Sequence, residues 1–163
     1  MKRLLLDTNI YGEMIFDQDF NNVKEKIQEK CVIHGFKIVR DELRDVPSKI
    51  KVNGINLRIG LLHIYDEITR KSYPFTEEMK VLGEKYYELY RKFGGSKSYD
   101  VMLKDCCIVA CASIHQIDIV VSEDSKSMLS ENALKAYESV NGLEKIKNPS
   151  FIGYLEFKRW LGE

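Results

Sequence analysis

Two carboxylates follow apolar runs that are far apart in the sequence. Residues 4–6 are all leucine and lead into Asp7, while residues 119–121 (Ile-Val-Val) lead through Ser122 and Glu123 to Asp124. Short apolar runs that end in turn-forming residues are typical of strands buried on both faces of a parallel sheet. The carboxyl ends of parallel strands meet at one edge, where open α/β sheets bind their ligands. We therefore expect Asp7 and Asp124 to lie together at that edge.

Two further acids are expected at the same edge. Glu42 follows an apolar run at residues 36–39, which we interpret as a second strand. Asp105 lies early in an expected helix, residues 99–115, that leads into the strand at 117–121. A helix that connects two parallel strands runs antiparallel to them, so its N-terminal part lies at their carboxyl edge. The sequence thus predicts that four carboxylates meet there.

Each acid also has an ordinary structural interpretation. Asp7 could form an Asx-turn, Asp41 is a good helix N-cap, and Ser122 or Asp124 could cap the next helix. Caps do not account for acids that lie inside helices among apolar residues, as expected for Glu42 and Asp105. Clustered carboxylates repel one another and raise one another's pKa, unless a cation neutralises them. Ligands that are all oxygen favour Mg²⁺ or Mn²⁺, so the pattern predicts a site for one of these ions.

Composition sets broad limits on function. The 163 residues, 44% hydrophobic and 31% charged, suit one soluble domain spanning residues 1–163. Lys plus Arg equals Asp plus Glu at 25 each, so no global positive field for tight nonspecific nucleic-acid binding is predicted. The apolar run at residues 4–6 is too short for a secretory signal, and no stretch is long enough to span a membrane. We expect a cytoplasmic protein without membrane contact.

The cysteines do not indicate a zinc site. They form no CxxC pair, and the histidines show no zinc-ligand spacing relative to them. We expect reduced cysteines that pack in the interior as small residues. The residues concerned are Cys31, Cys106, Cys107, Cys111, His34, His63 and His115.

Strand and helix patterns alternate along the chain. This alternation predicts the α/β class, as a three-layer α/β/α sandwich with a mainly parallel central sheet. A turn is expected at Asn53-Gly54, and a helix that begins after the cap residue Thr76 should bury a stripe of Val81, Tyr86, Leu89 and Phe93. Expected strands are residues 3–6, 36–39, 72–75, 117–121 and 143–147; expected helices are 20–34, a short one from 40 that Pro47 interrupts, 57–68, 77–93, 99–115, 128–142 and 154–161; residues 10–19 are expected to form a loop.

Four segments together resemble the PIN-domain ribonucleases, which include the VapC-type toxins. The matching segments are Leu4-Leu5-Leu6-Asp7-Thr8-Asn9, Val39-Arg40-Asp41-Glu42-Leu43, residues 104–112 around Asp105, and Ile119-Val120-Val121-Ser122-Glu123-Asp124. Each segment alone is a weak signal, but their order and spacing are specific as a set. Weaker similarity extends the resemblance over nearly the whole chain. The resemblance implies Asp7, Glu42, Asp105 and Asp124 as an acidic quartet, with Asn9 and Ser122 as supporting polar groups.

Some positions have close competitors. Asp41 or Asp45 could take the place of Glu42 in the quartet, and Glu123 could take the place of Asp124. Leu43 after Glu42 and the family pattern at residues 122–124 favour the quartet as stated. No family signature covers residues 10–19 or 49–72.

The resemblance also implies a reaction. An ion held by the quartet would polarise a phosphodiester and activate water, so single-stranded RNA would be cut endonucleolytically. Asp7 and Asp105 are the expected direct ligands, with Asp124 and Glu42 completing the site directly or through water. The expected phosphate contacts, for which a solvated charged face is the simpler interpretation, are Arg40, Arg44, Lys49 and Lys104. RNA is the expected substrate, while the resemblance leaves open whether an antitoxin protein or a second copy of the chain is a partner.

Two other classes of function compete with this hypothesis. One is a catalytically silent PIN-like scaffold that binds RNA or protein. The other is a phosphotransfer domain, which also places an aspartate after its first strand. A haloacid-dehalogenase-like phosphatase needs a second aspartate two residues on, where this chain has Asn9. A receiver domain gives no reason for Glu42 and Asp105.

Overall fold

The computed structural model describes all residues, 1–163, and is built around one parallel sheet. The strand order is β5-β2-β1-β6-β7, and each neighbouring pair is parallel. A separate antiparallel hairpin pairs two short strands across the expected turn at Asn53-Gly54. The sheet strands are β1 Lys2–Leu6, β2 Cys31–Phe36, β5 Thr69–Tyr73, β6 Ile119–Val121 and β7 Ser150–Ile152; the hairpin strands are β3 Lys51–Val52 and β4 Ile55–Asn56.

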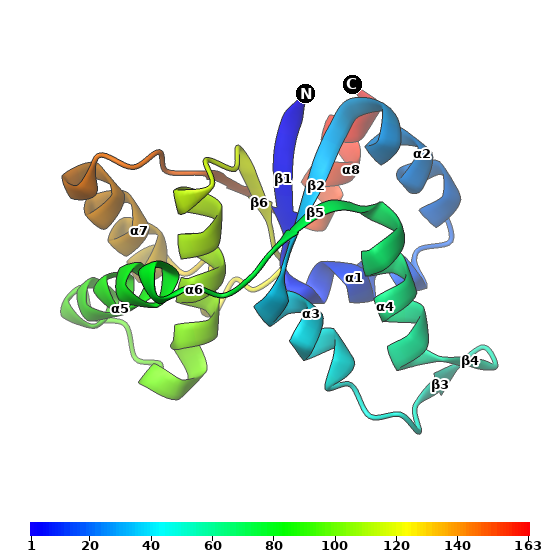
Figure 1. The fold of residues 1–163 in the computed structure, drawn as a ribbon, viewed down its shortest axis with the longest axis horizontal. Helices are drawn as coiled ribbons and strands as arrows, with labels where there is room; N and C mark the ends of the chain where they lie inside the picture. Colours follow the sequence, from blue (N-terminus) through cyan, green and yellow to red (C-terminus); the bar gives the residue numbers. More distant parts are fainter.

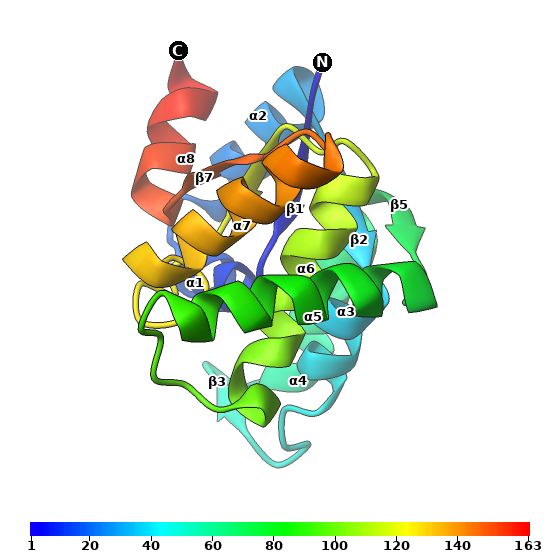
Figure 2. The ribbon, with the colours of Figure 1, turned by 90° about the vertical axis from the view of Figure 1, so that its left-hand side faces the viewer.

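Helices cover both faces of the sheet (Figure 1). One side carries α1 Thr8–Phe16, α2 Phe20–Lys30, α4 Leu57–Ile68 and α8 Tyr154–Gly162. The other side carries α5 Glu77–Lys92, α6 Tyr99–Ile114 and α7 Glu131–Glu144, with α5 crossing over α6 (Figure 2). The remaining helix, α3 Lys37–Arg44, follows the carboxyl end of β2. The expected three-layer α/β/α sandwich is confirmed, and none of its helices combines the length and apolarity needed to cross a membrane.

The central strand β1 positions the rest of the sheet. Its residues Leu4, Leu5 and Leu6 are at most 1% exposed, because helices cover both faces. Leu6 pairs with Val121 at the end of β6, so the strands finish at the same level. The residues that follow both strands therefore emerge at one edge, as the sequence predicted.

The helix α6 forms the centre of one outer layer. Its residues from Cys106 to Ser113 are all buried, in agreement with the apolar character of this stretch on all sides. The cysteines are free and buried, which confirms that they pack in the interior. Gly83 of α5 lies close to this helix, since an added Cβ would meet the Cys107 sulfur at 3.0 Å. Small residues thus let α5 and α6 pack closely.

The second strand lies earlier than predicted. Residues 36–39 were expected as a strand, but β2 is Cys31–Phe36 and residues 37–39 already belong to α3. A helix over residues 20–34 was expected to end before Gly35. Instead, Gly35 lies in β2 and allows the Tyr65 side chain to pack closely against the strand. A Cβ at Gly35 would lie 2.1 Å from the Tyr65 hydroxyl oxygen. Glu42 is consequently in the second turn of α3 rather than directly after a strand.

Three other expectations were wrong. Residues 10–19 do not form only a loop: α1 covers most of them, with Ile10, Tyr11 and Met14 buried at helical spacing. The last strand is β7 Ser150–Ile152 instead of residues 143–147, because α7 continues to Glu144. On α5, Tyr86 is fully buried, but Val81 and Phe93 are 46% and 41% exposed. The buried face of α5 is instead formed by Met79, Leu82, Gly83, Tyr86 and Tyr90.

Candidate metal-binding site

Asp7 is the most buried of the four acids. It is 5% exposed and caps α1, accepting a hydrogen bond from the Thr8 backbone N–H at 2.8 Å. The Ser122 hydroxyl donates to Asp7 Oδ2 at 2.6 Å, and the Asn9 amide donates to the same oxygen at 3.3 Å. Burial raises the pKa of Asp7 above its usual range, although the Ser122 hydrogen bond opposes this shift. The expected supporting roles of Asn9 and Ser122 thus have a geometric basis.

Glu42 reaches the site from α3. Its Oε1 accepts a hydrogen bond from the Thr8 hydroxyl at 3.1 Å, so Thr8 links the start of α1 to α3. Burial raises the pKa of Glu42, with a further contribution from the negative charge of Asp7, while the Thr8 hydrogen bond and Lys104 lower it. Asp7 is therefore more than a local cap of α1, because its charge also acts on Glu42.

Asp105 and Asp124 meet at a serine. The Ser127 hydroxyl lies 2.8 Å from Asp105 Oδ2 and in short contact with Asp124 Oδ2. The Ser127 hydroxyl therefore lies between the two carboxyl groups and contacts both of them. Burial raises the pKa of Asp105 to about 7, and the charges of Asp7, Asp124 and Glu42 add to this effect. The structure thus brings together acids from four separate segments.

Basic side chains do not neutralise this cluster. None of the ion pairs in the structure includes any of the four acids. Their hydrogen-bond donors are the neutral hydroxyl, amide and backbone groups described above. A buried group of carboxylates with only neutral partners fits a hard divalent cation in charge and in donor chemistry. However, no group of three or more His, Cys, Asp or Glu side chains is arranged to hold an ion as they stand.

The competing acids have structural roles. Asp41 accepts from Lys37 at 2.6 Å and from Arg44 at 3.1 Å on the surface of α3. Glu123 Oε1 accepts from the Tyr154 backbone N–H at 2.5 Å and so caps the start of α8. Asp45 is the C-terminal cap residue of α3 and is exposed. Of the competing acids, Glu42 and Asp124 are the ones whose carboxylates contact the partners of other quartet members, Thr8 and Ser127.

The expected phosphate contacts are scattered. Arg40 makes two hydrogen bonds of 3.1 Å to Asp66, and Arg44 pairs with Asp41. Lys49 is exposed in the segment before the β3–β4 hairpin. Lys104, which is exposed on α6, is the member of this group whose charge acts on a quartet acid, Glu42. This charge effect favours Lys104 over the other three as a phosphate contact near the site.

Two residues at the site were not singled out from the sequence. Thr8 lies between two recognised positions, but nothing in its surroundings indicated that its hydroxyl would reach Glu42. Ser127 is one of three serines spaced closely after Asp124, with Ser125 and Ser130. Only the conformation of this loop decides which serine faces the acids, so residue type gave no signal.

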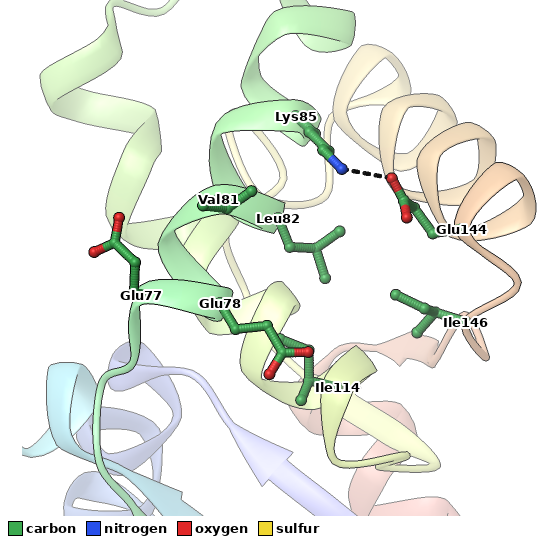
Figure 3. A pocket seen from close by; sticks show the side chains of 8 residues that line it. All are labelled: Glu77, Glu78, Val81, Leu82, Lys85, Ile114, Glu144 and Ile146. Atoms are coloured by element: carbon green, nitrogen blue, oxygen red, sulfur yellow. Dashed lines mark hydrogen bonds and ion pairs between the residues drawn. The ribbon is translucent and has the colours of Figure 1, made fainter.

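The hollows of the surface lie elsewhere. A cavity of 290 Å³ between α5, α6 and α7 has an apolar floor that includes Leu82 and Ile114 (Figure 3). Its rim carries Lys85, whose ammonium lies 2.6 Å from Glu144. None of the four acids lines this cavity or either of the two other hollows. The candidate site is therefore a cluster at the sheet edge rather than a deep pocket.

Comparisons with known proteins support the fold. No family model matches the chain, and neither does any curated protein. Among solved structures, a chain of VapBC2 from Rickettsia felis bound to a promoter DNA fragment is 20% identical with a TM-score of 0.60, covering 93% of this chain and 98% of that one. A chain of DNA-bound VapBC from Salmonella typhimurium is 12% identical with a TM-score of 0.58, covering 94% and 98%. A chain of FitAcB from Neisseria gonorrhoeae is 21% identical with a TM-score of 0.54, covering 80% and 92%. The protein thus has the fold of chains in the VapBC2, VapBC and FitAcB structures. This is the PIN-like fold that the sequence resemblance implied.

Proposed function

We propose that this protein is a metal-dependent endoribonuclease that cuts single-stranded RNA. The observation that carries the proposal is the acidic quartet, Asp7, Glu42, Asp105 and Asp124, which meets at the carboxyl edge without a basic partner. The raised pKa of Asp105 reflects the electrostatic cost of this arrangement. Folds retain such costs at functional sites more often than elsewhere. The likeness to the VapBC and FitAB chains supports the same class of protein.

In this proposal each residue has a defined task. Asp7 and Asp105 would hold Mg²⁺ or Mn²⁺, and Asp124 and Glu42 would complete the site directly or through water. The bound ion would supply charge for the phosphodiester and lower the pKa of water. Asn9 and Ser122 fix the orientation of Asp7 through their hydrogen bonds, and Thr8 does so for Glu42. Lys104, whose charge acts on Glu42, would contact a phosphate of the RNA.

A protein partner and a cellular compartment belong to the same proposal. The solved neighbours described above are structures of VapBC2, VapBC and FitAcB, and the first two are bound to DNA. We infer an antitoxin partner for this chain and a cytoplasmic location, in keeping with an RNA substrate. Co-purification of the chain with the product of an adjacent reading frame would test the partner, and a chain that stays unbound would contradict it.

The competing function is a catalytically silent scaffold of the same fold. It is favoured by one observation, that none of the surface hollows is lined by a quartet acid. Cleavage mapping on total RNA with Mn²⁺, Mg²⁺ or chelator separates the two functions. The nuclease predicts defined cleavage sites that disappear in chelator. The scaffold predicts RNA or protein binding without any metal-dependent cut.

A further inference from the structure

The loop between β6 and α7 carries a buried serine that joins two acids. Ser127 is 6% exposed, and its hydroxyl contacts the Oδ2 atoms of Asp105 and Asp124. Its backbone N–H donates separately to Asp124 Oδ1 at 3.1 Å. Asp105 comes from α6 and Asp124 from the loop after β6, so Ser127 links side chains from two separate elements.

No other hydroxyl at the site has this position. Thr8 contacts the carboxylate of Glu42 alone, and Ser122 contacts that of Asp7 alone. Ser127 is also held firmly, since the Ser130 hydroxyl donates to its carbonyl oxygen at 2.8 Å. A bridging group that is itself fixed can set the separation of two carboxylates.

We propose that Ser127 is a positioning residue that keeps the carboxylates of Asp105 and Asp124 side by side, so that both can bind one divalent cation. This inference rests on the proposed function, because it assumes that the two acids bind one ion. Two carboxylates that face each other repel, and a hydroxyl between them reduces their freedom to turn away. Hydrogen-bond partners of metal ligands typically contribute 10–100-fold to metal affinity. Ser127 would do so without being a ligand.

The substitution Ser127→Ala removes the hydroxyl and leaves the backbone of the turn unchanged. The backbone hydrogen bond to Asp124 Oδ1 remains possible in the alanine variant, so the loop keeps this contact. Ser125→Ala is the matched control, because Ser125 is exposed in the same loop and only its backbone N–H is bonded, to the Glu123 carbonyl at 3.0 Å. Ser127→Thr retains the hydroxyl.

The measurement is the Kd for Mn²⁺ of the purified full-length protein, by calorimetry and by electron paramagnetic resonance. We expect Ser127→Ala to bind Mn²⁺ roughly 10–100-fold more weakly than the wild type, on the scale of other hydrogen-bond partners of metal ligands. Ser125→Ala should bind as the wild type does, and Ser127→Thr should restore much of the affinity. A melting curve in chelator shows whether each variant is folded. If the alanine variant does not fold, Ser127→Cys keeps the volume with a weaker hydrogen bond and must show the same loss.

Three outcomes would overturn the inference. The first is a Ser127→Ala protein with wild-type Mn²⁺ affinity, and the second is an equal loss in Ser125→Ala. Both leave the nuclease proposal intact if the wild type binds Mn²⁺ and cleaves RNA. The third is a wild type that neither binds Mn²⁺ nor cleaves RNA, in which case the proposed function fails together with the role of Ser127.

Discussion

The backbone amide of Asp7 donates a hydrogen bond to the carbonyl oxygen of Val121 at 2.8 Å. This bond extends the pairing of β1 and β6 by one step beyond Leu6 and Val121. It fixes the start of α1 against the loop that carries Ser122 and Asp124. The two halves of the candidate site are therefore tied together by main-chain atoms, and their separation does not depend on side-chain packing alone.

The first prediction concerns stability and metal at Asp105. Above pH 7, where Asp105 is ionised, replacing it with Asn removes one charge from a cluster of carboxylates, so the metal-free variant should melt at a higher temperature than the wild type. A ligand that binds only the folded state contributes about 2.7 kcal/mol at a hundredfold excess over Kd. Most of this Mn²⁺-induced gain should be lost in Asp105→Asn.

Thermal melts with chelator and with Mn²⁺ check this prediction. Asp100→Asn, on the exposed first turn of the same helix, is the control and should keep the wild-type metal shift. A variant Asp105→Asn that melts lower without metal and retains the full shift would show a structural role for this acid.

The second prediction concerns pH. The pKa of Asp105 in the folded protein is about 7, above its ordinary value of 3.8. Between these values the folded state retains a proton that the unfolded state has lost. Stability in chelator should therefore fall as pH rises from 4 to 7, by at most about 1.4 kcal/mol per pH unit for this group, and then level off.

Urea unfolding in chelator at pH 5 and pH 7.5 measures this effect. Other groups also titrate, so the informative quantity is the difference between the wild type and Asp105→Asn. The free energy of unfolding of the wild type should fall more over this interval. Equal pH dependence in both proteins would contradict the raised pKa.

The third prediction separates Glu123 from Asp124. Glu123→Ala should lower the melting temperature through loss of the α8 cap, worth about 1 kcal/mol, and should leave the Mn²⁺ shift in place. Asp124→Asn should reduce the Mn²⁺ shift. Differential scanning fluorimetry of both variants decides the assignment, and the reverse pattern would place the metal ligand at Glu123.

The fourth prediction tests the close approach of β2 and α4. An added Cβ at Gly35 would lie 2.1 Å from the Tyr65 hydroxyl oxygen and 2.6 Å from Cζ, so Gly35→Ala should destabilise the fold by roughly 1–3 kcal/mol. Gly12→Ala is the control, because nothing lies within 4 Å of its added Cβ and alanine favours a helix by about 1 kcal/mol. Chemical denaturation of both variants provides the comparison, and a neutral Gly35→Ala would show that Tyr65 can move away.

Much of the site could be predicted because its acids are tied to strand ends. Asp7 and Asp124 follow apolar runs whose chemistry specifies buried parallel strands, and Asp105 lies in a helix whose direction follows from the strand after it. Glu42 was expected at this edge, although the strand before it was predicted at residues 36–39 and is in fact β2, Cys31–Phe36. The expectation still held because α3 begins at the same edge where β2 ends.

The remainder depends on contacts that the sequence does not encode locally. Gly35 indicated a helix end because glycine is common there, whereas its actual role depends on Tyr65, which is remote in the sequence. Residues 10–19 contain a helix whose start is fixed by Asp7, for which we had considered an Asx-turn but not a helix cap. Ser127 could not be told from Ser125, because one loop conformation decides which hydroxyl turns inward.

The most direct test of the central claim is cleavage of a labelled single-stranded RNA by purified protein in Mn²⁺. We predict cutting by the wild type and by Asp100→Asn, none in chelator, and a loss of at least about a hundredfold in Asp7→Asn and Asp105→Asn, since each substitution removes the charge of a ligand but keeps its size. Cleavage by Asp105→Asn at the wild-type rate would contradict the account.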